Sequence, residues 1–211
     1  MDRWEKVVYN LSTGFCALAM KALDYRLIVH GKENIPKGRA IIAANHASYL
    51  DPISLAVGLG KLTFIARDLD SNHNFMSSMF QRWLKLAGVI TIDGRKMQRD
   101  ALIQVLDKLE KGNKVAIFPE GTRSIDGKIG YFNNGVSLIA ELSDSPVVPV
   151  SLSGTYEIWP RHGRIKYSGE VRLNVCNRLY LNKQITDKSE RRKDLTERIR
   201  SELESGLIYS H

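Results

Sequence analysis

The sequence predicts an α/β fold, a single domain with a mainly parallel mixed sheet flanked by helices. Two observations lead to this prediction. Short apolar runs, such as residues 41–44 and 115–118, are typical of strands that are buried on both faces of a sheet. Segments with apolar residues at helical spacing alternate with these runs along the chain. The 211 residues are enough for one domain with a sizeable core, and no linker divides them.

The first predicted element is an amphipathic helix over residues 4–23. Its longest uncharged run, residues 7–20, is too short and too polar for a bilayer, which needs about 20 mostly apolar residues. Acidic residues near its start are a poor fit to a signal peptide. Two interpretations stay open: the helix lies in a membrane interface, or it packs on the protein's own core. We therefore divide the chain into this helix, residues 1–24, and a domain, residues 25–211.

The later elements follow from apolar spacing, with glycine, proline and polar residues at the breaks. Strands are expected at residues 25–29, 40–44, 62–66, 89–92, 115–118 and 147–152. Helices are expected at residues 52–57, 75–86, 101–109, 136–142 and 187–207. Pro149 is expected to interrupt its strand, because proline lacks the N–H group that a ladder uses. Alternation within residues 164–181 predicts two edge strands.

The composition narrows the functions without choosing one. The net charge of +8 suits nucleic acid, phosphorylated metabolites or anionic lipid. Cys16 and Cys176 lie far apart and form no Cys-x-x-Cys pattern, which argues against a disulfide framework or a zinc site and fits a reducing compartment. The sequence contains no Gly-x-Ser-x-Gly elbow, no Walker A loop and no Gly-x-Gly-x-x-Gly pattern.

One histidine stands out as a candidate base. Of the five histidines, His46 alone has a carboxylate, Asp51, at a short fixed offset beside a predicted strand end. Such a pair can place the carboxylate on one imidazole nitrogen and leave the other for substrate. The alternative is that Asp51 only caps the helix that begins with Pro52. For Ser48 we prefer a capping box with Asp51 over a catalytic role.

A second group of residues is suited to bind an anion. Arg95 follows a predicted strand, and Arg123 lies in the turn after another. Gly121 allows the backbone of that turn to face a bound group, and the planar fork of arginine suits phosphate. Glu120 either orients a substrate hydroxyl or pairs with an arginine, and the sequence does not separate these roles.

Four ordered blocks within about residues 31–155 resemble the glycerolipid acyltransferase family, typified by bacterial 1-acyl-sn-glycerol-3-phosphate acyltransferase. The blocks are Asn45-His46 with Asp51, Gly88-Val89-Ile90-Thr91-Ile92-Asp93 with a following arginine, Phe118-Pro119-Glu120-Gly121-Thr122-Arg123-Ser124, and Val147-Val148-Pro149-Val150. The resemblance implies that His46 is the general base and that Asp51 orients it. It assigns Glu120, Gly121, Thr122, Arg123 and Arg95 to the glycerol-phosphate headgroup. Gly94 precedes Arg95, where the family usually has the arginine directly after the acidic residue.

The resemblance also implies the reaction and the partners. We expect transfer of a fatty acyl group from acyl-CoA or acyl carrier protein to the sn-2 hydroxyl of 1-acyl-sn-glycerol-3-phosphate, with no other cofactor and no metal. The expected partners are membrane lipid and the acyl donor, not nucleic acid, and the expected location is peripheral, on the cytoplasmic face of the cell membrane. Alternatives are acylation of glycerol-3-phosphate or another lysolipid, and a non-catalytic module that binds anionic lipid.

Overall fold

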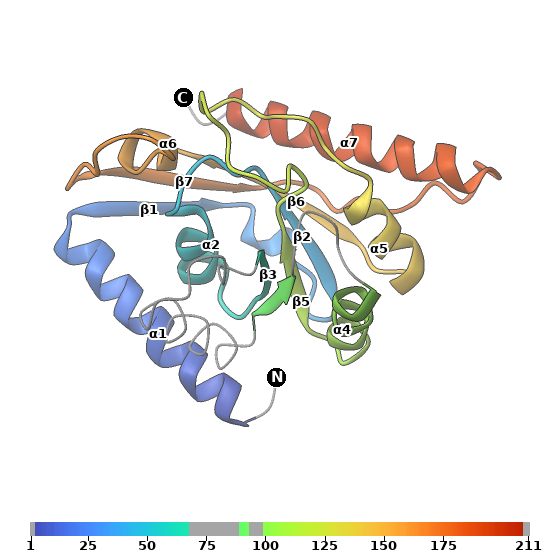
Figure 1. Ribbon diagram of the computed structural model, residues 1–211, viewed down its shortest axis with the longest axis horizontal. Helices are drawn as coiled ribbons and strands as arrows, with labels where there is room; N and C mark the ends of the chain where they lie inside the picture. Colours follow the sequence, from blue (N-terminus) through green and yellow to red (C-terminus); the bar gives the residue numbers. More distant parts are fainter. Residues whose placement is uncertain (1–2, 68–88, 93–98, 209–211) are drawn as a thin grey trace.

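The computed structural model describes residues 3–67, 89–92 and 99–208, and they form a seven-stranded sheet covered by helices on both faces (Figure 1). The strands are β1 (Tyr25–His30), β2 (Ala40–Ala44), β3 (Thr63–Arg67), β4 (Ile90–Ile92), β5 (Lys114–Ile117), β6 (Val147–Ser153) and β7 (Gly169–Val175). The helices are α1 (Arg3–Ala22), the 3-10 turn η1 (Lys32–Asn34), α2 (Asp51–Leu59), α4 (Arg99–Glu110), α5 (Gly135–Ser143), α6 (Thr155–Ile158) and α7 (Lys188–Ile208). The predicted helix at residues 75–86 lies outside the described residues.

The strand order is β1-β7-β6-β2-β5-β3-β4. Neighbouring strands run parallel except β6 and β7, which are antiparallel. This confirms the predicted α/β class and the mainly parallel mixed sheet. Because β2 and β5 are adjacent and parallel, the turns that follow them meet at one edge of the sheet.

The prediction of two edge strands within residues 164–181 is wrong. That segment contains one strand, β7, which lies inside the sheet between β1 and β6. Alternation is real there, since Val171, Leu173 and Val175 are buried while the residues between them are half-buried. Alternation of apolar and polar residues indicates that one face of a strand is more deeply buried. It does not indicate whether the strand pairs with one neighbouring strand or with two.

Pro149 does not interrupt β6, although it lacks an N–H group. It lies opposite Ala43 of β2, and its carbonyl oxygen accepts a hydrogen bond from the Cys176 N–H at 2.9 Å. That side of the strand faces the end of β7, whose ladder with β6 begins at the next residue, Val150. The N–H group that Pro149 lacks would therefore point to the end of the ladder between β6 and β7. Its absence removes no hydrogen bond between β6 and β2.

Strand β2 divides the core into two layers, because successive side chains of a strand point to opposite faces. Ala40, Ile42 and Ala44 pack in the layer under α1 and α2. Ile41 and Ala43 pack in the layer that α4, α5 and α7 cover (Figure 1). All five residues are fully buried, which explains the continuous apolar run in the sequence.

Helix α1 has a buried face and an exposed apolar stripe. On the buried face, the Tyr9 hydroxyl donates to the Gly60 carbonyl oxygen at 2.6 Å and accepts from the Leu62 N–H at 3.2 Å. On the opposite face Trp4, Leu11 and Phe15 are 75%, 71% and 73% exposed. The helix thus packs on the core and also presents an apolar stripe outward. Within the described part of the chain, no helix is both long enough and apolar enough to cross a bilayer.

Candidate active site

The site begins where β2 ends, and Asn45 fixes that end. Its side-chain amide donates to the Leu152 carbonyl oxygen at 3.0 Å, and its side-chain oxygen accepts from the Leu152 N–H at 2.7 Å. Asn45 is buried, so these two bonds replace contacts with water. The paired bonds attach the start of the turn to the neighbouring strand β6 and set the direction in which His46 leaves the sheet.

Asp51 is the first residue of α2 and is completely buried. One of its oxygens, Oδ2, lies 2.8 Å from His46 Nδ1 and accepts the N–H groups of Ala47 and Ser48 at 2.7 Å each. The helix itself has Leu50 at its N-cap position, without a side-chain cap. The carboxylate therefore holds the His46 turn closed, and the alternative in which it only caps the helix does not describe the structure.

The contact with Asp51 indicates which tautomer the neutral His46 ring adopts. An ionised carboxylate can only accept hydrogen bonds, so the neutral ring carries its proton on Nδ1 and keeps a lone pair on Nε2. The ring stacks on Phe118, with centroids 4.0 Å apart and planes 16° apart, and 18% of the side chain stays exposed. No described residue forms a hydrogen bond with Nε2. That nitrogen is free to take a proton from a bound molecule.

Glu120 joins the two turns in a way that the sequence did not indicate. Its Oε1 accepts the backbone N–H of His46 at 2.8 Å, and its Oε2 accepts the N–H of Gly130 at 2.9 Å. The Ser124 N–H in turn donates to the His46 carbonyl oxygen at 2.7 Å. Burial raises the pKa of Glu120, and the two backbone N–H groups partly oppose that shift. Neither oxygen pairs with an arginine of the described chain, so the predicted ion pair is not formed there, and both oxygens hold backbone N–H groups of the site.

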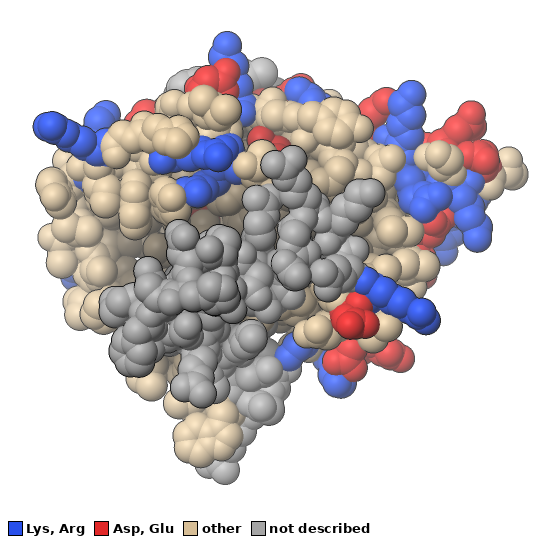
Figure 2. All heavy atoms as spheres, viewed as in Figure 1, with Lys and Arg blue, Asp and Glu red and all other residues tan. Residues whose placement is uncertain are grey.

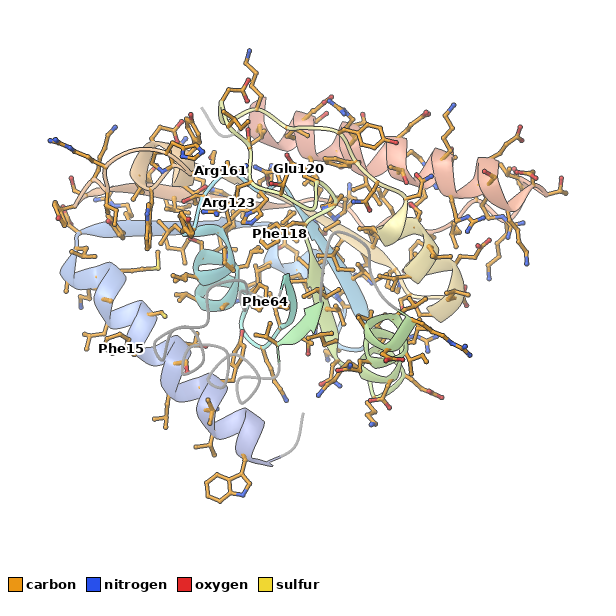
Figure 3. All side chains as sticks on the ribbon, in the orientation of Figure 1. Phe15, Phe64, Phe118, Glu120, Arg123 and Arg161 are labelled. Atoms are coloured by element: carbon orange, nitrogen blue, oxygen red, sulfur yellow. The ribbon has the colours of Figure 1, made fainter. Side chains whose placement is uncertain are left out.

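The second turn carries Arg123, whose charge is poorly satisfied. Its guanidinium carbon lies 3.4 Å above the centre of the Tyr49 ring, and its buried Nη1 has no hydrogen-bond partner among the described residues. Gly121 has φ of +66°, which favours glycine, and its N–H donates to the Phe118 carbonyl oxygen within the turn. Figure 3 shows Glu120, Arg123 and Arg161 gathered above Phe118.

A third segment reaches the site, and sequence reasoning missed it. The Ser48 hydroxyl donates to the Trp159 carbonyl oxygen at 2.6 Å and accepts from the Leu50 N–H at 3.0 Å. The predicted capping box is therefore only half formed, since the Ser48 N–H reaches Asp51 while its hydroxyl binds elsewhere. Arg161 Nη1 lies 3.4 Å from the Arg123 carbonyl oxygen and 3.5 Å from Thr122 Oγ1. Only the fold brings this segment, which follows α6, to the turns.

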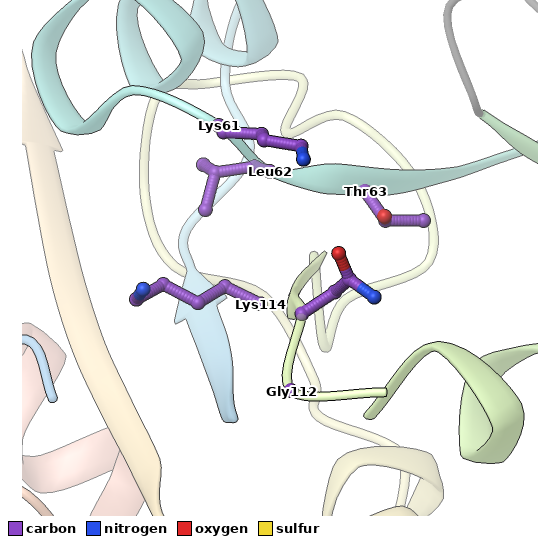
Figure 4. A pocket seen from close by; sticks show the side chains of 6 residues that line it. Lys61, Leu62, Thr63, Gly112 and Lys114 are labelled. Carbon is purple, nitrogen blue, oxygen red and sulfur yellow. The ribbon is translucent and has the colours of Figure 1, made fainter. Parts of the chain in front are cut away.

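One predicted ligand cannot be placed, and the described cavity lies away from the turns. Arg95 lies outside the described residues. Within those residues, no group of three or more His, Cys, Asp or Glu side chains is placed to hold a metal ion. A cavity of about 150 Å³ lies between residues 61–63 and 112–114 (Figure 4). It is at the starts of β3 and β5, the sheet edge opposite the turns.

Comparison with known proteins identifies the class. The sequence profile of the family described as Acyltransferase matches residues 26–153, which include both turns. The chain therefore belongs to the acyltransferase family.

Individual relatives carry a more specific name. A protein of Chlamydomonas reinhardtii named 1-acyl-sn-glycerol-3-phosphate acyltransferase is 31% identical over 75% of this chain and 48% of its own length. A protein of the same name from Pseudomonas aeruginosa is 31% identical over 82% of this chain and 66% of its own length. The crystal structure of the 1-acyl-sn-glycerophosphate (LPA) acyltransferase PlsC from Thermotoga maritima has a TM-score of 0.71 and 30% identity, covering 95% of this chain and 81% of that one. The chain spans about half the length of the first curated relatives it matches.

Proposed function

We propose that the protein transfers a fatty acyl group from acyl-CoA or acyl carrier protein to the sn-2 hydroxyl of 1-acyl-sn-glycerol-3-phosphate, which yields phosphatidic acid. The observation that carries this proposal is the pairing of His46 with the buried Asp51, 2.8 Å apart, beside a turn that presents Arg123. The names of the relatives support the choice of acceptor.

In the proposed reaction, His46 acts as the general base. Nε2 takes the proton of the acceptor hydroxyl as its oxygen attacks the thioester carbonyl carbon, and Asp51 stabilises the imidazolium that forms. Such base catalysis contributes about 10²–10⁴-fold. The tetrahedral intermediate then collapses, the C–S bond breaks, and the thiol leaves with the proton from the imidazolium. Because thiols have a pKa of about 8.5, the leaving group needs little acid assistance.

The structure favours direct transfer over an acyl-enzyme on Ser48. The Ser48 hydroxyl is buried and already bonded at 2.6 Å to the Trp159 carbonyl oxygen. We therefore expect no burst of thiol when enzyme and acyl donor are mixed without acceptor. A burst equal to the enzyme concentration would instead indicate a covalent intermediate.

An acceptor panel tests the proposed activity, with free-thiol release as the readout. The panel contains 1-acyl-sn-glycerol-3-phosphate, glycerol-3-phosphate, a monoacylglycerol and lysophosphatidylcholine, each with acyl-CoA and with acyl carrier protein as donor. We expect the highest kcat/KM for 1-acyl-sn-glycerol-3-phosphate. A higher kcat/KM for glycerol-3-phosphate or lysophosphatidylcholine would indicate that this compound is the acceptor instead. Absence of thiol release with every combination of donor and acceptor would contradict acyl transfer.

We further propose that α1 attaches the protein to the cytoplasmic surface of the cell membrane. Its exposed stripe of Trp4, Leu11 and Phe15 lies opposite the face that packs on the core, and the chain carries a net charge of +8. Apolar burial and attraction to anionic lipid both favour such an arrangement. Leu11→Glu should reduce binding to vesicles that contain phosphatidylglycerol at least tenfold, whereas Asn10→Glu, beside the stripe, should change it little. Equal binding by both variants would contradict attachment through α1.

A further inference from the structure

We propose that Arg161 is a second ligand of the acceptor's phosphate and that it makes the site selective for phosphate monoesters. This inference rests on the proposed function of the same site. Arg161 lies outside the residues that the family profile matches, which end at residue 153, and it follows the short helix α6.

The segment that carries Arg161 is held against both turns. Ser48 forms an isolated bridge with Pro160, and the rings of Tyr49 and Trp159 lie 5.2 Å apart. The Tyr156 hydroxyl donates to the Ile125 carbonyl oxygen at 2.9 Å, which connects α6 to the chain after the second turn. The backbone around Arg161 is therefore placed by the same turns that place His46 and Arg123.

The guanidinium of Arg161 has hydrogen-bonding capacity to spare. Its two described contacts, with the Arg123 carbonyl oxygen and Thr122 Oγ1, are long at 3.4 and 3.5 Å and both use Nη1. A guanidinium has five N–H donors. Most of those donors therefore remain for a ligand beside the second turn.

Arg123 and Arg161 form no ion pair with any carboxylate of the described chain, although other arginines do. Arg172 reaches Glu170 at 2.6 Å, and Arg198 reaches Asp194 at 2.8 Å. The carboxylate nearest to the second turn in sequence, Glu120, is occupied by two backbone N–H groups. In the orientation that they share, Figure 2 shows Lys and Arg atoms where Figure 3 labels Arg123 and Arg161.

Arg123 and Arg161 come from adjoining segments, and neither is paired with a described carboxylate, so together they match a doubly charged ligand. A phosphate monoester carries about −1.5 to −2 charges at pH 7, whereas a phosphodiester carries one. Three free phosphate oxygens can also accept hydrogen bonds from two guanidinium groups at once. Arg161 therefore recognises the terminal phosphate of 1-acyl-sn-glycerol-3-phosphate, and a lysophospholipid diester gains less from it.

The test compares Arg161→Ala with Arg164→Ala, which removes the same charge from an exposed side chain three residues later. Steady-state kinetics are measured with 1-acyl-sn-glycerol-3-phosphate, lysophosphatidylcholine and a monoacylglycerol as acceptors. We expect Arg161→Ala to raise the KM for the monoester about tenfold or more, with kcat within about threefold of the wild type. The KM for the monoacylglycerol should stay within about twofold, and Arg164→Ala should behave as the wild type.

Two results would overturn the assignment of Arg161. One is an unchanged KM for the monoester, and the other is an equal loss with all three acceptors, which would mean that Arg161 only supports the turn through the Arg123 carbonyl oxygen. The wild-type rates keep the proposals apart. If the wild-type enzyme does not acylate the monoester, the proposed function itself is wrong. If the wild-type enzyme acylates it and Arg161→Ala has the same KM, only the role of Arg161 is rejected.

Discussion

The turns after β2 and β5 lie side by side, yet the charged side chain of each turn is held in a different way. In the first turn, Asp51 accepts three hydrogen bonds from its own turn, all between 2.7 and 2.8 Å. In the second turn, Arg123 has a buried Nη1 without a described partner and an aromatic ring beneath its guanidinium. We infer from this difference that the first turn positions the base and that the second turn binds the acceptor. Asp51 holds the His46 ring and its turn through Oδ2, while its other oxygen, Oδ1, is buried without a described partner. In our proposal the Arg123 guanidinium of the second turn binds the phosphate of the acceptor.

The two turns are nevertheless one unit. Glu120 of the second turn accepts the backbone N–H of His46, and Ser124 donates to the carbonyl oxygen of the same residue. His46 is therefore held through its backbone by the turn that we propose binds the phosphate. In the proposed reaction, binding of the headgroup at the second turn would set the distance between the acceptor hydroxyl and the base, which is the positional advantage that enzymes gain from remote contacts.

The largest effect is expected from breaking the first turn. Asp51→Ala removes the acceptor of the His46 ring and of two buried backbone N–H groups. Each unsatisfied buried N–H costs about 1–3 kcal/mol of unfolding free energy, and turnover should fall by about 10²–10⁴-fold. Chemical denaturation and thiol release measure the two effects. A variant with normal stability and normal turnover would contradict the role given to this turn.

A smaller and more selective effect is expected from the second turn. Arg123→Ala should weaken transition-state binding of a phosphorylated acceptor by about 1.5–3 kcal/mol, which is about 10–150-fold in kcat/KM. The same variant should act on a monoacylglycerol at nearly the wild-type rate, because that acceptor has no phosphate. Equal losses with the two acceptors would remove Arg123 from the headgroup site and make the second turn a structural element only.

The smallest effect concerns the carboxylate that joins the turns. Burial raises the pKa of Glu120 above 4.5, so the folded state binds its proton more tightly than the unfolded state. The stabilisation from this group is thus fully present below the unfolded pKa and is lost as the pH rises through the folded pKa. The unfolding free energy of the wild type relative to Glu120→Gln should decrease between about pH 4 and pH 7. An increase over that interval would contradict the raised pKa.

The sequence predicted those parts of the site that are local. His46 and Asp51 are five positions apart in one turn, and the parallel arrangement of the apolar runs places the second turn beside the first. The contacts of Glu120 were not predicted because its partners are the backbone N–H groups of His46 and Gly130. Almost every residue has such a group, so the sequence does not show which ones are used.

The parts that depend on long-range packing were not predicted. Arg161 reaches the second turn only because β6 and α6 carry it there, and its sequence neighbours show no pattern that points to Arg123. The position of β7 inside the sheet has the same explanation, since its pairing with β1 joins segments about 140 residues apart in the chain. Local patterns predict an element, and the topology decides its neighbours.

The proposal that His46 removes the acceptor proton is tested by a comparison of two histidine variants. Thiol release with 1-acyl-sn-glycerol-3-phosphate is measured for His46→Ala and for His162→Ala, in which an exposed histidine is removed. We expect turnover to fall by about 10²–10⁴-fold for His46→Ala, with vesicle binding retained, and to stay unchanged for His162→Ala. Turnover by His46→Ala within about threefold of the wild type would contradict the proposal.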